Sequence, residues 1–126
     1  GRTYRLLNVA SHMWSYPFGG MGADVPYAHN LWFDCARVAG LFPFMLLIVL
    51  SFKYIQALFN IINNNIIDLI LRYTFWFLSL AMLMVFLSEP VLEGIPMIFE
   101  FFCFLLGVIM YYAQCLERRN WNFVMM

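Results

Sequence analysis

The chain has 126 residues, of which 64% are apolar and 11% are charged, and its mean hydropathy is +0.79. Soluble domains carry about 25% charged residues, so this composition argues against a soluble domain and indicates a membrane protein. Seven basic residues balance seven acidic ones, which argues against a nucleic-acid-binding surface.

Residues 1–34 are expected to form an irregular segment outside the membrane. The stretch SHMWSYPFGGMG (11–22) combines aromatic residues with a Pro-Gly-Gly turn and precedes the first apolar run. The glycine-rich sequence GGMG at 19–22 lacks the Lys-Ser/Thr pair of a phosphate-binding loop, so a turn is the expected structure. Four aromatic side chains are predicted to form an interfacial docking surface: Trp14, Tyr16, Phe18 and Trp32.

Three uncharged apolar runs indicate three membrane-spanning helices. Each run is short of the about 20 residues that cross the hydrocarbon core, so each is extended over polar neighbours that can reach the membrane surface. Continuous apolar runs without alternation favour helices over barrel strands. The predicted fold is an all-α membrane protein with a three-helix region over 35–116 and a C-terminal tail over 117–126. The predicted spans are 35–54, 69–88 and 95–116.

Breaks in these runs predict the connections between the helices. Pro43, inside the first predicted span, predicts a kink that Gly40 makes easier. The three asparagines at 63–65 predict a turn before the second span. The sequence SEPVLEG at 88–94 predicts a tight connector before the third.

Three spans place the N-terminal segment and the 89–94 loop on one side of the membrane. The 54–68 loop and the C-terminus then lie on the opposite side. The second side carries one more basic residue than the first, which favours the C-terminus inside. The residues counted are Arg2, Arg5 and Arg37 against Lys53, Arg72, Arg118 and Arg119.

Glu100 lies inside the third predicted span with phenylalanine on both sides. An ionisable group inside a membrane is costly, so it indicates either a function or a partner of opposite charge. Arg37, near the same membrane face, is the expected partner. Two alternatives stay open: an ion pair between Glu100 and Arg37 that ties helices together, and a quinone-pocket or proton-relay carboxylate assisted by Arg37 and His29.

The remaining polar residues do not predict a metal site. His12 and His29 are the only histidines, and their spacing matches no compact metal motif. Asp68 and Arg72 are four residues apart and are expected to form a local pair on one helix face. Three cysteines without a C-x-x-C motif are expected to be small buried hydrophobic residues: Cys35, Cys103 and Cys115.

The spacing of His12, Tyr16 and His29 ahead of three spans resembles the cytochrome b anchor subunit of succinate dehydrogenase. That family has a Ser-Pro-His-x-x-x-Tyr segment followed by a Ser-x-x-His-Arg stretch. Here Pro26 stands at the position of the quinone-contacting serine and Asn30 at that of the arginine. Ser11 adjoins His12 without an intervening proline, and the second span lacks the family's haem histidine. The resemblance implies an anchor that contributes to a quinone site.

The sequence favours a small non-catalytic membrane subunit that scaffolds a respiratory or ATP-synthesising complex. Aromatic residues make up 20% of the chain, more than three helices can bury among themselves, so other subunits and lipids are the expected partners rather than a free monomer. A start at Gly1 and the absence of a cysteine framework favour the mitochondrial inner membrane, with the C-terminus in the matrix. The alternatives are a succinate dehydrogenase-like anchor and a small oligomeric transporter. No cofactor is expected beyond contact with quinone or lipid.

Overall fold

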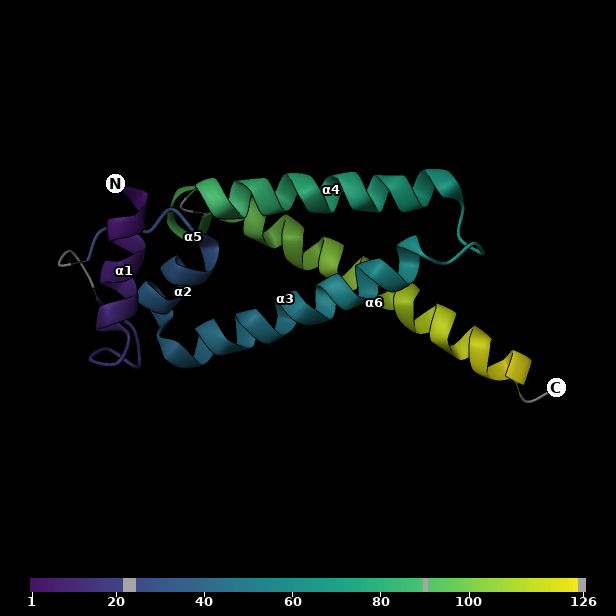
Figure 1. The fold of residues 1–126 in the computed structure, drawn as a ribbon, viewed down its shortest axis with the longest axis horizontal. Coiled ribbons are helices and arrows are strands. Elements are labelled where there is room, and N and C mark those ends of the chain that lie inside the picture. The colour runs from purple at the N-terminus through teal and green to yellow at the C-terminus, as the bar shows by residue number, and fades with distance from the viewer. Residues whose placement is uncertain (22–24, 90, 125–126) are drawn as a thin grey trace.

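Three long helices run lengthwise through the molecule, and three shorter helices gather at one of its ends (Figure 1). This computed structural model describes residues 1–21, 25–89 and 91–124. Within that part of the chain all regular structure is helical. The elements are α1 (Arg2–His12), α2 (Leu31–Ala39), α3 (Leu41–Ile62), α4 (Leu69–Ser88), α5 (Val91–Gly94) and α6 (Pro96–Val124).

Three of these helices are long and apolar enough to cross a membrane, which confirms the predicted fold class. The candidate spans cover Leu41–Ile62, Leu69–Ser88 and Pro96–Arg118, with 22, 20 and 23 residues. The second span agrees with the prediction, and the third extends slightly beyond it. The C-terminal tail predicted from residue 117 instead continues α6 as far as Val124.

The first span begins later than predicted because the helix breaks at Gly40. Gly40 has φ 96° and ψ −174°, so it separates α2 from α3 instead of continuing one helix. Pro43 lies in the first turn of α3, where backbone N–H groups have no partner within the helix. The kink predicted at Pro43 is therefore replaced by a sharp change of direction three residues earlier.

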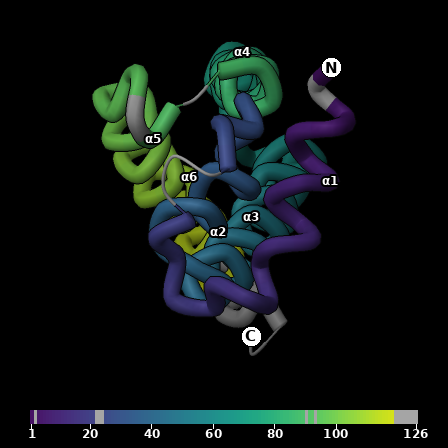
Figure 2. Tube along the Cα trace, turned by 90° about the vertical axis from the view of Figure 1, so that its left-hand side faces the viewer, coloured from purple at the N-terminus to yellow at the C-terminus, as the bar shows by residue number. Residues whose placement is uncertain are grey.

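The N-terminal region is folded rather than irregular, and we call residues 1–39 the N-terminal cap. Helix α1 lies across the ends of the long helices, packed beside α2 (Figures 1 and 2). The cap has a small hydrophobic core of its own, with Phe44 from α3 packed against it. Its buried members are Val9, Met13, Met21, Val25, Ala28 and Ala36.

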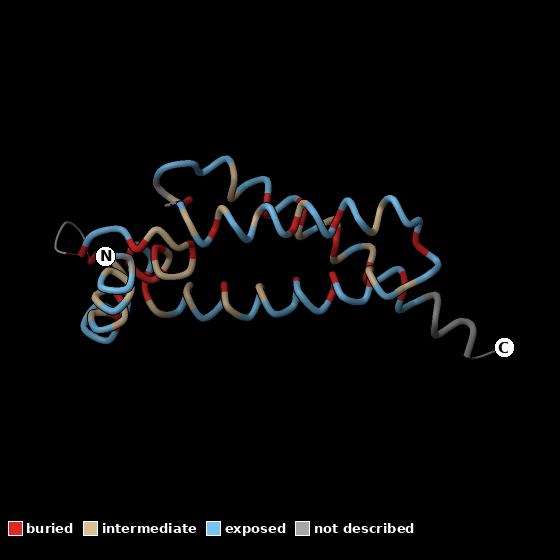
Figure 3. The backbone as a smooth tube through the Cα atoms, turned by 45° about the horizontal axis from the view of Figure 1, so that its top comes forward, coloured by how far each residue is buried: buried red, intermediate tan, exposed pale blue. Residues whose placement is uncertain are grey.

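The three long helices bury narrow inward faces and leave broad outward faces exposed (Figure 3). Phe102 of α6 lies at the centre, with its ring centroid 4.9 Å from that of Phe86 and 5.4 Å from that of Tyr54. The Tyr54 hydroxyl also bonds to Ser79 Oγ, joining α3 to α4. Because Ser79 donates its own proton to the Phe75 carbonyl, Tyr54 is the donor of that bond.

The turn between α3 and α4 is held by side chains of the turn itself and of α4. Asp68 caps α4, with Oδ1 accepting from the backbone N–H groups of Ile70 at 2.8 Å and Leu71 at 3.4 Å. Arg72 Nη1 donates to the Ile62 carbonyl at 3.1 Å and to Asn65 Oδ1 at 3.3 Å. The predicted local pair of Asp68 with Arg72 is thus replaced by two separate roles, because each side chain satisfies a helix end.

The connections between the long helices lie at the ends of the bundle where the sequence predicted them. The cap and α5 lie together at one end, and the 63–68 turn lies at the other end, toward which α6 runs (Figure 1). Figure 2, seen from the capped end, shows α1, α2 and α5 in front of the long helices.

Replacing Gly40 by alanine should open the junction between the cap and α3. A Cβ at Gly40 would lie 2.3 Å from the Pro17 carbonyl oxygen, and its φ of +96° is strained for an L side chain. We expect Gly40→Ala to destabilise the junction by about 2 kcal/mol. Exchange of the amide protons of Met21 and Leu41 in mild detergent, measured by mass spectrometry, should accelerate by about thirtyfold.

Gly107→Ala is the matched control for this substitution. Nothing lies within 4 Å of a Cβ added at Gly107 in α6, so the change should stabilise that helix by about 0.5–1 kcal/mol. Unchanged exchange in Gly40→Ala would contradict the role of this junction.

Candidate functional site

A buried carboxylate organises the turn that leads into α2. Asp34 is 1% exposed, and its two carboxylate oxygens accept from the backbone N–H groups of Ala28 at 2.8 Å and Asn30 at 3.2 Å. Arg37, one helical turn later, has Nε 4.0 Å from Asp34 Oδ1. Asn30 caps α2, with Oδ1 accepting from the Phe33 N–H at 3.3 Å. The connection into α2 is therefore tightly fastened.

The residues predicted to form an ion pair or a quinone pocket are only partly brought together. The Arg37 guanidinium lies 4.6 Å from the centroid of the Tyr27 ring, and that ring lies 6.4 Å from the ring of His29. Glu100 is instead exposed on α6, and the described ion pairs do not include the predicted pair of Glu100 with Arg37. Because Arg37 belongs to the cap rather than to the first span, its neighbouring carboxylate is Asp34.

Three of the four predicted docking residues lie on the cap surface. Trp14 is 78% exposed and Phe18 is 93% exposed, and Tyr16 is also exposed. Trp32 is placed differently: it is half-buried, and its Nε1 donates to Ser51 Oγ of α3 at 2.9 Å. Its ring also packs edge-on against Phe86 of α4 at 6.3 Å. Trp32 therefore links the cap to the bundle.

Helix α1 extends this exposed surface in a way that the sequence prediction missed. Tyr4 and Leu7 are both more than half exposed, and their spacing with Trp14 places them on one face of α1 and its continuation. The opposite face, carrying Val9 and Met13, packs into the cap core. We call the exposed residues the aromatic stripe: Tyr4, Leu7, Trp14, Tyr16 and Phe18. A helical reading of residues 2–14 would have placed Tyr4 and Leu7 on the same face as Trp14.

The loop that carries the stripe is fixed by backbone hydrogen bonds to α2 and α3. Gly20 N–H donates to the Val38 carbonyl at 3.2 Å, and Met21 N–H to the Arg37 carbonyl at 3.2 Å. Leu41 N–H donates back to the Pro17 carbonyl at 2.8 Å. The stripe is thus presented on a rigid support rather than on a free tail.

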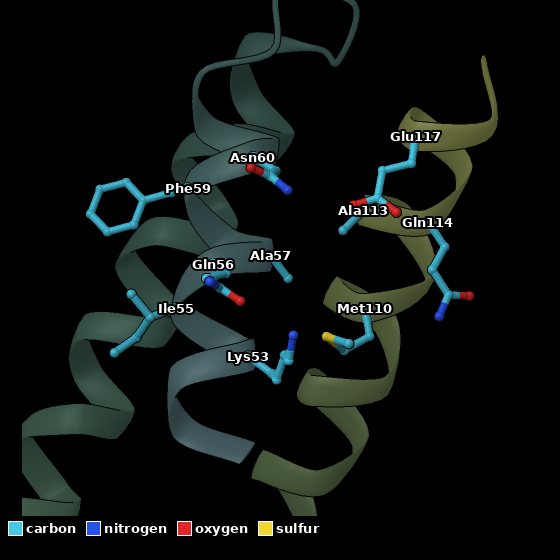
Figure 4. A pocket seen from close by; sticks show the side chains of 10 residues that line it. All are labelled: Lys53, Ile55, Gln56, Ala57, Phe59, Asn60, Met110, Ala113, Gln114 and Glu117. Carbon is cyan, nitrogen blue, oxygen red and sulfur yellow. The ribbon is translucent and has the colours of Figure 1, made fainter. Parts of the chain in front are cut away.

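A second candidate site, also missed by the sequence prediction, is a polar groove between α3 and α6. It has a volume of about 580 Å³ and is shown in Figure 4. Buried Ala57 and Ala113 lie at its base, where the two helices approach. A smaller hollow of about 270 Å³, lined partly by Asn63 and Asn64, adjoins it. The polar side chains that line the groove are Lys53, Gln56, Asn60, Gln114 and Glu117.

The spacing of these residues is the signal that could have revealed the groove. Lys53, Gln56 and Asn60 follow one another at three and four residues, so they lie on one face of α3. Gln114 and Glu117 are three residues apart on α6. Only the packing of α3 against α6 shows that the two sets face the same groove.

No family model, curated protein or solved structure matches this chain. Within the described residues, no three His, Cys, Asp or Glu side chains gather in a way that could hold a metal ion.

Removing the Asp34 carboxylate should loosen the cap. Asp34→Ala leaves the N–H groups of Ala28 and Asn30 without their acceptors, at a cost of about 1–3 kcal/mol. We expect faster proteolysis of the segment that precedes α2, measured by mass spectrometry of the fragments. Asp34→Asn keeps one oxygen acceptor and should give an intermediate rate. Equal rates in all three proteins would contradict this role.

Burial should also slow the reaction of Cys35 with alkylating reagents. Desolvation raises the pKa of the Cys35 thiol, because the buried site disfavours the charged thiolate. The thiolate fraction near pH 8 is then lower than that of an exposed cysteine. In the double variant Cys103→Ala/Cys115→Ala, alkylation should still rise with pH beyond the ordinary pKa of a thiol. A plateau below that value would contradict the prediction.

Proposed function

We propose that this chain is a non-catalytic subunit of a multi-subunit membrane complex, and that it docks to a neighbouring subunit through the aromatic stripe. The observation that carries the proposal is the exposure of Trp14 and Phe18 on a cap that has its own hydrophobic core and backbone hydrogen bonds. Large exposed apolar side chains gathered in one patch are typical of interaction surfaces.

The physical advantage of the stripe is that its support is already ordered. Binding through a flexible tail would lose the conformational entropy of that tail, whereas a rigid cap avoids most of this cost. Tryptophan is also among the residues that contribute most at protein interfaces. Because α1 lies across the ends of the long helices, the proposed partner surface lies at a membrane face (Figure 1).

The long helices support membership of a larger assembly. Within the three candidate spans, 28%, 17% and 22% of the residues in the most apolar window are buried in the chain itself. The remaining apolar surface is available to lipid and to the spans of other subunits. Helix α4 in particular is the least buried of the three.

The proposed complex is a respiratory or ATP-synthesising one in the mitochondrial inner membrane, with the C-terminus in the matrix. The cysteine spacing of the chain, without a disulfide framework, supports this location, and the distribution of basic residues supports this orientation. Protease protection of tags at the two ends of the chain, in isolated mitochondria and in mitoplasts, tests the proposed orientation.

The docking proposal is tested by co-purification in mild detergent. The double variant Trp14→Ala/Phe18→Ala should lose about tenfold or more of the co-purifying subunits, because it removes two exposed aromatic anchors. Quantitative mass spectrometry of the tagged chain and its partners measures this loss. Both residues are exposed, so the thermal unfolding of the isolated chain should change little.

Phe42→Ala/Phe77→Ala is the matched control. These phenylalanines are 71% and 65% exposed but lie on α3 and α4, outside the cap. This variant should keep the partners that depend on the stripe. Recovery of the unmodified chain as a pure homo-oligomer would overturn the proposal.

A further inference from the structure

The groove between α3 and α6 carries opposite charges at its two ends. Figure 4 shows Lys53 beside Met110 at one end, and Asn60 with Glu117 at the other. Lys53 and Asn60 are seven residues apart on α3, and so are Met110 and Glu117 on α6. Seven residues rise about 10 Å along the axis of an α-helix. The positive end lies toward the middle of the α3 span, and the negative end toward the 63–68 turn.

Neither charge is neutralised by the described part of the chain. The described ion pairs do not include Lys53 or Glu117. The amides of Gln56, Asn60 and Gln114 also make no side-chain hydrogen bond with other described residues, although Lys53 and Gln56 belong to a candidate membrane span. Polar groups at such a depth are costly unless a ligand or partner satisfies them.

Beyond Lys53 the same helix face becomes apolar. Val49 and Leu46 precede Lys53 by four and seven residues, and about half of each side chain is exposed. On α6, Leu106 precedes Met110 by four residues. From the 63–68 turn toward the cap, the groove therefore presents the Glu117 carboxylate, then amides, then the Lys53 ammonium group, and finally hydrocarbon side chains.

We propose that the groove binds the headgroup of a phosphatidylethanolamine phospholipid. Its phosphate pairs with Lys53, its ammonium group pairs with Glu117, and its acyl chains follow the apolar face beside Val49. The phosphate oxygens accept from the amide groups in between. The short ethanolamine bridge joins the two charges of the headgroup, so one molecule offers an anion to Lys53 and a cation to Glu117.

The order of charges distinguishes this ligand from other occupants. Phosphatidylglycerol, an acidic phospholipid, carries no cation that could pair with the Glu117 carboxylate. A second copy of the chain, related by a two-fold axis along the membrane normal, would bring Lys53 opposite Lys53 at the same depth. Like charges facing each other at such depth are unfavourable. An ethanolamine headgroup satisfies both ends, and its ammonium donates hydrogen bonds that a choline group lacks.

The proposal is tested by titrating the purified full chain in detergent with dioleoyl phospholipids and following its thermal unfolding. Phosphatidylethanolamine should bind about tenfold more tightly than phosphatidylglycerol, with phosphatidylcholine between them. Glu117→Gln should abolish this preference by weakening ethanolamine binding and strengthening glycerol binding. Lys53→Met should weaken the binding of all three lipids by about tenfold.

Glu100→Gln is the matched control, because Glu100 is an exposed acid on α6 that does not line the groove. It should leave the order of lipid affinities unchanged. Lys53 and Glu117 are exposed, so their variants should unfold at the same temperature as the unmodified chain without added lipid. This comparison separates a change in binding from a change in folding.

Three titration results would overturn the proposal. The first is equal affinity for the three headgroups, and the second is an unchanged order of affinities in Glu117→Gln. The third is that water-soluble glycerophosphoethanolamine binds as tightly as the lipid, which would assign no role to the acyl chains. A photoreactive group introduced at Gln114 should capture lipid in native membranes, and capture of a polypeptide in its place would also contradict the proposal. Lipid binding does not depend on the aromatic stripe, so this test can fail while the docking proposal holds.

Discussion

The close approach of two glycines fixes the relation between the cap and the membrane-spanning helices. A Cβ at Gly19 would lie 2.3 Å from the Val38 carbonyl oxygen, and one at Gly40 would lie 2.3 Å from the Pro17 carbonyl oxygen. The backbone can therefore pass at hydrogen-bonding distance only where neither residue has a side chain. The contact orients α1 across the bundle and sets where the first span begins.

Hydrophobic patterning predicted the membrane helices because their signal is local and continuous. The 69–88 span agrees with α4, since the Asp68 cap and the end of the apolar run coincide with its ends. The first span was displaced because an apolar run crosses the α2–α3 break without interruption. Gly40 was recognised as a weak point, but its positive φ depends on the loop containing Gly19, which is distant in sequence.

The cap and the groove were harder to predict because they depend on which faces of the helices pack against one another. The exposure of Trp14 follows from the packing of Val9 and Met13 on the opposite face of α1. Trp32 has the same amphipathic character as Trp14, yet it turns inward because Ser51 offers an acceptor on α3. Residue type alone does not separate these two tryptophans.

Packing, rather than residue type, also explains why Glu100 and Glu117 differ in their capacity to bind a ligand. Both are exposed acids on α6, and the sequence singled out Glu100 because it is flanked by phenylalanine within an apolar run. Glu117 is the one that shares a groove with a cation, because α3 packs against the later part of α6 and brings Lys53 to the opposite end of that groove. An isolated acid at a lipid-facing position can move toward the membrane surface or become neutral. An acid and a base held at a fixed separation instead define a shape and an order of charges, which is the information that selects one ligand over another.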